Sequence, residues 1–244
     1  MKNGAQTLRT CRCGSTTITY HVTFRKRKTL GIQVEAPDQV RVTAPLRTPE
    51  VRIKEVVENK SKWILEKLAH LREREAKKER KQFLDGERFH YLGERYPLDI
   101  VHDGSLRVPE VKLVQDTFCV LVPNEDPNLI RSALENWYRE RALDEINQRV
   151  AAFQPLFQVQ PTAVKVKTQQ KRWGSCTSRG NLLFNWKLIM APGSLLDYVV
   201  VHEMCHLVHL NHSKAFWQLV EKVMPDYQKR RQALRDQGIK FDWT

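Results

Sequence analysis

The chain has 244 residues, of which 41% are hydrophobic, and a formal net charge of +13 at pH 7. Its longest apolar run, at residues 195–201, is far shorter than the roughly 20 residues of a membrane-spanning helix, and residues 1–12 lack the apolar stretch of a secretory signal. The five cysteines follow no disulfide framework, so the composition excludes a membrane protein and a disulfide-rich secreted protein and predicts a cytoplasmic one.

The N-terminal part of the chain is expected to be β-rich. Residues 1–15 are predicted to be a flexible N-terminus, in which Cys11 and Cys13 lack a second metal-binding pair and have no structural importance. Residues 16–45 alternate polar and β-branched residues, which predicts short strands. The basic run at 25–28 is expected to form an exposed turn between them.

A long helix, further strands and a second helix are expected next. Thr48 can cap the first helix, with Pro49 at its first position, and an apolar stripe that fades into mixed charge extends it to about Lys81. Residues 83–122 return to short strands, and residues 127–153 place apolar side chains at helical spacing.

The last third of the chain contains a predicted hairpin and a predicted buried helix. Residues 164–167 alternate like a strand, and residues 172–189 are expected to form a hairpin that turns at 178–180. Ser194 with Asp197 three residues later forms a capping-box pattern, which should begin an almost entirely apolar helix.

Within that helix, His202, Glu203 and His206 form an H-E-x-x-H motif. Residues four apart lie on one helix face, so both imidazoles can bind one zinc ion at about 2.0–2.1 Å. Glu203 then lies beside the metal and can take the proton of a zinc-bound water, whose pKa is lowered to about 7. The motif therefore predicts a zinc-dependent hydrolase with Glu203 as the general base.

A catalytic zinc needs a third protein ligand, and two more histidines follow. His212 can supply it if the chain turns at Leu210 and Asn211, after which Ser213 can cap the next helix. His209 would lie in line with the first two histidines along a straight helix, where it would complete a tetrahedron poorly. We favour His212 and keep His209 as the alternative ligand or as a group that supports one.

The residues around this motif resemble those of the YgjP-like metallopeptidases, a zincin family similar to the SprT and WLM proteases. The matching segments are 27–31, 84–86, 172–176, 180–182, 185–186, 188–192, 197–203 with His206, 211–213 and 216–217. The resemblance implies zinc at His202, His206 and His212, Glu203 as catalyst, and a peptide or protein substrate. It also implies that the strand at 181–186 pairs with an extended substrate.

The predicted fold is α+β in three parts. Residues 1–15 form the flexible N-terminus, residues 16–125 form a β-rich region with the long charged helix, and residues 126–244 form a zincin-like catalytic region.

Three residues near the hairpin are predicted to contact substrate: Arg172, Trp173 and Asn185. Arg172 could bind an oxyanion or a phosphate, although a bulged strand with a packed tryptophan explains Arg172 and Trp173 equally well. Further basic residues surround the hairpin and could attract an anionic ligand such as a nucleotide or nucleic acid; they are Lys165, Lys167, Lys171, Arg179 and Lys187.

Three functions are therefore weighed. A zinc peptidase is favoured. The first alternative is a metal-dependent nucleoside triphosphate pyrophosphatase or phosphohydrolase, which the absence of a second carboxylate cluster disfavours. The second is a nucleic-acid-associated protein, either with a structural zinc or as a protease acting on DNA-bound proteins.

Overall fold

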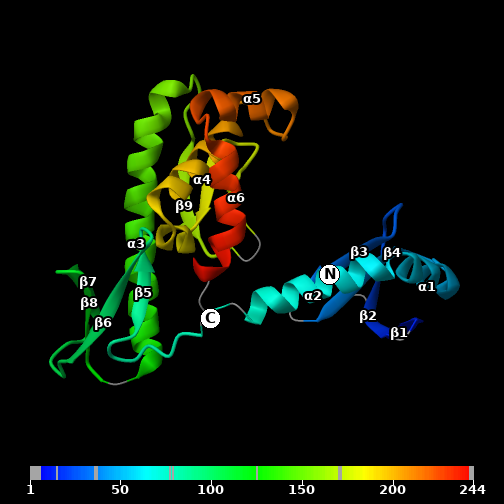
Figure 1. Ribbon diagram of the computed structural model, residues 1–244, viewed down its shortest axis with the longest axis horizontal. Coiled ribbons are helices and arrows are strands. Elements are labelled where there is room, and N and C mark those ends of the chain that lie inside the picture. Colours follow the sequence, from blue (N-terminus) through cyan, green and yellow to red (C-terminus); the bar gives the residue numbers. More distant parts are fainter. Residues whose placement is uncertain are drawn as a thin grey trace. The chain divides into compact units, whose positions relative to one another are not determined.

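The computed structural model describes residues 7–14, 16–35, 38–76, 78, 80–124, 126–169 and 172–241. The chain divides into two compact units, Met1–Lys78 and Glu79–Thr244 (Figure 1). Each unit has its own hydrophobic core. Helices and mixed sheets occur in both units, so the predicted α+β class is confirmed.

The N-terminal unit is a four-stranded sheet with two helices. Its strands lie in the order β1-β2-β4-β3, and only the β2–β4 pair is parallel. Val42 of the sheet, Val57 of α1 and Ile64 of α2 are fully buried in the core between them. The elements are β1 (Thr7–Cys13), β2 (Thr16–Arg25), β3 (Gly31–Glu35), β4 (Gln39–Pro45), α1 (Glu50–Asn59) and α2 (Ser61–Ala76).

Strand β1 differs from the flexible segment predicted for residues 1–15. It pairs with β2 in antiparallel register, with Cys11 opposite Ile18. Cys11 is buried in the core of this unit, so it has a structural role that the sequence analysis missed. Residues 1–6 and residue 15 lie outside the described residues.

The long helix predicted from Thr48 to about Lys81 is two helices. They separate at Lys60, whose φ of −104° and ψ of 7° interrupt the helical backbone. Thr48 is not the cap: its hydroxyl donates to the carbonyl of Pro45 at 2.8 Å, and Pro49 occupies the N-cap position. The predicted extension beyond α2 includes residues 77 and 79, which lie outside the described residues.

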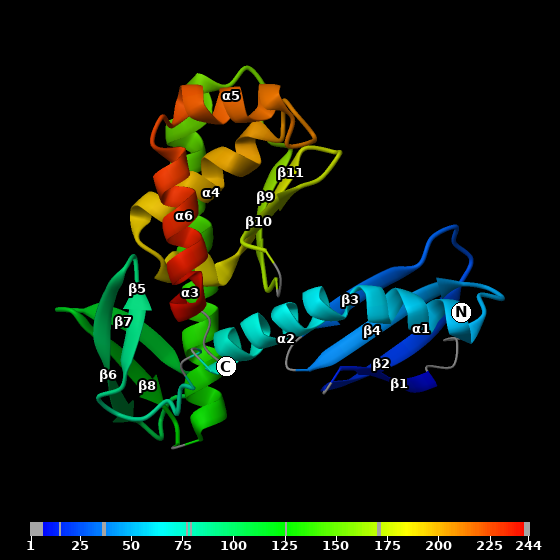
Figure 2. The same cartoon turned by 45° about the vertical axis from the view of Figure 1, so that its right-hand side comes forward.

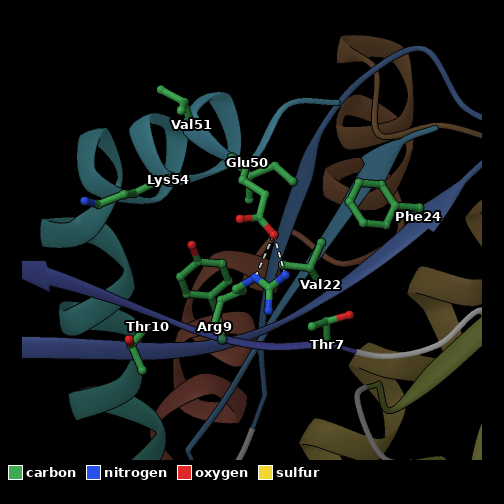
Figure 3. Close-up of a pocket in the computed structure, with 10 residues that line it drawn as sticks. Thr7, Arg9, Thr10, Val22, Phe24, Glu50, Val51 and Lys54 are labelled. Atoms are coloured by element: carbon green, nitrogen blue, oxygen red, sulfur yellow. Dashed lines mark hydrogen bonds and ion pairs between the residues drawn. The ribbon is translucent and has the colours of Figure 1, made fainter. Parts of the chain in front are cut away.

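A pocket of about 240 Å³ lies between β1, β2 and α1. Figure 3 shows Arg9 and Glu50 pointing toward each other across it, where they form an ion pair, with Val22 and Phe24 on its wall. None of the residues that line this pocket is a predicted site residue.

The C-terminal unit contains two sheets, ordered β5-β6-β8-β7 and β10-β11-β9. The pairs β6–β8 and β9–β11 are parallel, and the others are antiparallel. Its strands are β5 (Arg88–Tyr91), β6 (Glu94–His102), β7 (Glu110–Val114), β8 (Thr117–Val122), β9 (Ala163–Lys167), β10 (Gly174–Cys176) and β11 (Asn181–Asn185). Its helices are α3 (Pro127–Phe153), α4 (Gly193–Cys205), α5 (Lys214–Val223), α6 (Tyr227–Gln237) and the 3-10 helices η1 (Gln154–Leu156), η2 (Trp186–Met190) and η3 (Gly238–Phe241).

Helix α3 joins the two sheets into one core and confirms the helix predicted at 127–153. It contacts β7 and β8 of the first sheet, β9 of the second, and helix α4, and both ribbon views show it running past these elements (Figures 1 and 2). Asp126 caps it by accepting a hydrogen bond from the backbone N–H of Asn128 at 2.9 Å.

The unit boundary after Lys78 differs from the predicted boundary after residue 125. The reason is the core: Phe89, Leu98 and Phe118 of the first sheet pack with the buried residues of α3 and α4. No helix among the described residues combines the length and the apolar character that a membrane span requires.

The predicted hairpin at 172–189 is confirmed in its first part. β10 and β11 pair in antiparallel register, and Gly180 with a φ of 74° makes the turn. The second strand ends early, because the side chain of Asn185 accepts a hydrogen bond from the N–H of Lys187 and begins η2.

The capping box predicted at Ser194 is wrong. Helix α4 begins at Gly193 after Pro192, so Ser194 is already inside the helix. Asp197 instead forms an ion pair with Arg149 of α3, at 2.9 Å between Oδ1 and Nε.

Candidate metal centre

Three histidines converge at the end of helix α4. His202 lies in its last turn, His206 follows as the C-cap, and His212 precedes α5. One ring nitrogen from each lies within 4.8 Å of the others. We call His202, His206 and His212 the histidine triad.

The chain reverses through a tight turn after Cys205, which brings His212 back to the helix. The N–H groups of Leu207, Val208 and His209 donate to carbonyls of α4 at 2.9–3.1 Å. The turn was expected at Leu210 and Asn211, and neither of these residues has a positive φ. Ser213 caps α5 as predicted, accepting from the N–H of Phe216 at 3.4 Å.

The triad fits a zinc ion. The Nε2 atoms of His202 and His212 lie 3.0 Å apart. Two nitrogen ligands at about 2.0–2.1 Å from one tetrahedral ion lie roughly 3.4 Å apart, so these rings are close to a ligand arrangement. Burial is the largest cause that lowers the pKa of His202 to about 3, which keeps it in the neutral form that a metal ligand needs.

His209 supports the triad without joining it. Its backbone carbonyl lies 2.9 Å from Nδ1 of His206. A hydrogen bond from Nδ1 to that carbonyl fixes the ring and leaves Nε2 free for a metal. The described residues therefore favour His212 over His209 as the third ligand.

Two aromatic side chains of α5 hold the triad in place. Phe216 is fully buried, and its ring lies 4.5–5.0 Å from the ring centroids of all three histidines. Trp217 stacks on His212 at 5.5 Å with an interplanar angle of 26°. This role of Phe216 and Trp217 was not predicted from the sequence, because it depends on the chain reversal that places α5 beside α4.

Glu203 lies beside the triad in a buried position. It is 5% exposed, and its Oε2 atom has no hydrogen-bond partner among the described residues. Burial raises the pKa of Glu203 to about 8, and the positive charge of Arg172 partly opposes that rise. A buried carboxyl oxygen without a partner fits a group that receives a proton from a bound water.

Gly174 of β10 leaves the space that Glu203 occupies. A Cβ atom at this position would lie 2.7 Å from both Cγ and Oε1 of Glu203, closer than real Cβ atoms approach. Gly174 lies in the segment 172–176 that resembles the family, but the sequence alone gives it no role. The contact joins residues far apart in sequence, so no local pattern shows it.

The three predicted substrate contacts occupy different environments. Arg172 is exposed and close enough to Glu203 to affect its pKa. The ring of Trp173 packs against Gly238, where a Cβ atom would lie 3.1 Å away. Asn185 is 5% exposed and donates to the carbonyl of Gln169 at 2.8 Å. Substrate binding by Asn185 stays a prediction, which its burial disfavours.

The open strand edge near Glu203 belongs to β10. β11, which was expected to pair with substrate, lies between β10 and β9 and is bonded on both sides. Within the described part of the chain, β10 has one paired edge and one free edge. An extended peptide can therefore add to β10 and cannot add to β11.

Most of the described basic residues around the hairpin are exposed. Lys165, Lys167 and Arg179 are exposed, and Lys187 lies over the ring of Trp186 at 5.7 Å. Lys171 lies outside the described residues. An anionic ligand at this surface stays a prediction.

A family model described as YgjP-like, metallopeptidase domain, matches residues 28–237. A search of curated proteins found no match. A solved structure that resembles the chain is the metallopeptidase zymogen abylysin of Pyrococcus abyssi, with 17% identity, a TM-score of 0.36, and coverage of 39% of this chain and 96% of that one. A likeness at this level carries no conclusion about function.

Proposed function

This chain belongs to the YgjP-like metallopeptidase family, and from that premise we propose that it cleaves peptide bonds at one zinc ion held by the histidine triad, with Glu203 as general base. The observation that carries the proposal is the convergence of three imidazole donors beside a buried carboxyl oxygen that has no partner. When bound, zinc supplies Lewis-acid chemistry: it polarises the scissile carbonyl and lowers the pKa of the attacking water to about 7.

Glu203 is the residue that moves the proton. As a carboxylate it accepts a proton from the water through Oε2 and then delivers it to the leaving amine. Burial alone favours its protonated form, but a cation at the triad and the charge of Arg172 both favour the carboxylate. Gly174 lets the carboxyl group take this position beside β10, because it has no side chain to occupy the same space.

The free edge of β10 offers the substrate a place to bind. Backbone hydrogen bonds to β10 would hold a peptide in extended form close to Glu203, without strong dependence on side-chain identity. Arg172 is a second proposed substrate contact, because it is exposed and lies close enough to Glu203 for its charge to affect that carboxyl group.

The ligand assignment is tested by elemental analysis of purified protein. We expect one zinc per chain in wild type and weakened binding in His212→Ala. His209→Ala is the matched control, since His209 supports His206 through its backbone carbonyl and the variant keeps that carbonyl. Full zinc retention in His212→Ala, with loss of zinc in His209→Ala, would mean that His209 is the third ligand.

The catalytic assignment is tested by a hydrolysis screen of casein and nucleoside triphosphates. We expect Glu203→Gln to keep its zinc and to lower peptide hydrolysis by about 10²–10⁴-fold, the usual contribution of a general base. Hydrolysis of triphosphates in place of casein would favour the phosphohydrolase alternative. A zinc-loaded Glu203→Gln variant with full peptidase activity would refute the role of Glu203.

A further inference from the structure

Arg231 of α6 is a half-buried cation that has no counter-ion among the described residues. In the described part of the chain it has no hydrogen bond or ion pair. It makes a cation–π contact with the ring of Trp217. Its neighbour Arg230 pairs with Asp226 at 2.9 Å and with Asp197 at 3.7 Å. Arg149 also pairs with Asp197, so the nearby carboxylates are already engaged by other arginines.

Arg231 lies close to the histidine triad. Its guanidinium carbon is 4.6 Å from the centroid of the Trp217 ring. That ring stacks on His212 at 5.5 Å and lies 5.8 Å from the ring of His202. His212 is exposed and Arg231 is partly exposed, so solvent reaches both side chains.

Arg231 and Arg172 lie beside different parts of the site. The Trp217 ring that Arg231 contacts stacks on His212. Arg172 is instead close enough to Glu203 to oppose the rise in the pKa of that carboxyl group.

An uncompensated guanidinium beside a divalent cation is electrostatically unfavourable unless an anion accompanies it. The side chain is held in place by Trp217, so it is ordered for binding before a ligand arrives. Its planar group of donors matches a carboxylate, which it can bind through two hydrogen bonds.

We propose that Arg231 is a substrate-binding residue that receives a carboxylate of the peptide, either the C-terminal carboxylate or an Asp or Glu side chain near the cleaved bond. The inference rests on the proposed peptidase function and adds its substrate class: peptides that place a negative charge at Arg231. Two other roles are separable from this one. An oxyanion contact would act on every substrate alike, and a packing role on Trp217 would act on stability alone.

The test uses full-length, zinc-loaded protein and an N-acetylated peptide library read by mass spectrometry. Each peptide is made in three forms: with a free C-terminal carboxylate, as a C-terminal amide with an internal Glu, and as the same amide with Gln. Arg231→Gln is compared with Arg231→Lys and with Arg235→Gln. Arg235 is the matched control, because it lies one turn later on α6, is exposed and, unlike Arg231, has no described contact with the ring of Trp217.

We expect wild type to prefer one charged form by about 10- to 100-fold in kcat/KM, the size of a charge-assisted hydrogen bond. Arg231→Gln should remove the preference through KM, Arg231→Lys should keep part of it, and Arg235→Gln should keep all of it. The form that is preferred identifies the source of the carboxylate. Equal hydrolysis of all three forms by wild type, or an equal loss of kcat on all three in Arg231→Gln, would overturn the proposal.

A binding experiment separates this inference from the proposed function. Calorimetric titration of zinc-loaded Glu203→Gln with the three peptide forms requires no catalysis. Selective binding of a charged form that Arg231→Gln abolishes would support the inference even if no peptide were cleaved. Cleavage that depends on Glu203 but not on peptide charge would keep the proposed function and refute the role of Arg231.

Discussion

The two units of the chain differ most in how they carry charge. Residues 1–78 hold 18 lysines and arginines against 8 aspartates and glutamates, a net charge of +10. Residues 79–244 hold 23 against 20, a net charge of +3. The triad and Glu203 nevertheless lie in the second unit, so most of the net positive charge is in a different unit from the candidate metal centre.

The cores of the two units also differ in the polar side chains that they bury. Among the described residues, the buried polar side chains are Asn185 and Glu203, and both belong to the C-terminal unit. A large core can hold a buried carboxyl group, because its other contacts offset the desolvation cost. The small N-terminal core is apolar. Burial of a polar group therefore locates the candidate site better than net charge does.

The largest expected effect comes from adding one methyl group to the C-terminal unit. In Gly174→Ala the new Cβ atom would lie 2.7 Å from Cγ of Glu203, so the carboxyl group must move. A displacement on the order of 1 Å at a catalytic group costs about 10²-fold in rate. We expect a loss of at least that size in kcat/KM with zinc content unchanged.

Gly104→Ala is the matched control for this variant. Gly104 lies in the same unit, and a Cβ atom there would meet nothing within 4 Å. It should keep full activity. Normal activity in Gly174→Ala would show that Glu203 tolerates displacement, and the proposed base would then need another position.

A second test compares the two cores by equal truncations. Ile64 of α2 and Ile146 of α3 are both 0% exposed, one in each core. Each Ile→Ala change should lower the free energy of unfolding of its own unit by about 2–5 kcal/mol. Hydrogen exchange measured unit by unit should show the two losses separately, and added zinc should raise protection in the C-terminal unit alone. Equal loss of protection in both units from either variant would mean that they unfold as one.

The pH dependence of stability should also differ between the two units. In metal-free protein the pKa of Glu203 is about 8, above its ordinary 4.5, so the folded state binds this proton more tightly than the unfolded state. Stability of the C-terminal unit should therefore fall as the pH rises from 4.5 to 8. The lowered pKa values of His202 and His212 have the opposite effect: they make stability rise with pH, but only at pH values below their ordinary pKa of 6.5.

The informative window is consequently pH 6.5 to 8. There the free energy of unfolding should fall by up to about 1.4 kcal/mol per pH unit, and Glu203→Gln should flatten the slope. The shifted groups described in the N-terminal unit are Cys11 and Tyr20, with ordinary pKa values of 9.0 and 10.0, so that unit should show no matching slope. A slope that persists in Glu203→Gln would assign it to another group.

Local spacing predicted the parts of the site that lie close in sequence. His202 and His206 are four residues apart on one helix, and Ser213 caps the next helix directly after His212. A pattern of that kind depends only on helix geometry and on a short turn. The same reasoning gave α3 its bounds, because its apolar stripe is regular over its whole length.

Contacts between distant segments were not predictable from the sequence. Gly174 meets Glu203 only because β10 packs beside α4, and Arg231 meets Trp217 only because α5 and α6 both pack on α4. Asp197 was predicted to form a capping box with Ser194, but it forms an ion pair with Arg149 on another helix. Tertiary packing determines these contacts, and local sequence patterns do not show which distant segments pack together.

The smallest expected effect is in the N-terminal unit, at the basic turn of residues 25–28. All four side chains are exposed, and Arg27 packs against Gly31, where its guanidinium would lie 3.1 Å from an added Cβ atom. Arg25→Gln, Lys26→Gln and Lys28→Gln leave that contact intact, and each should change the free energy of unfolding by less than about 0.5 kcal/mol. Hydrolysis of a short neutral peptide should be unchanged in the triple variant, because the candidate chemistry lies in the other unit. A fall in kcat/KM on that peptide would show that the charge of the N-terminal unit acts on the metal centre, and the separation of charge from chemistry would no longer hold.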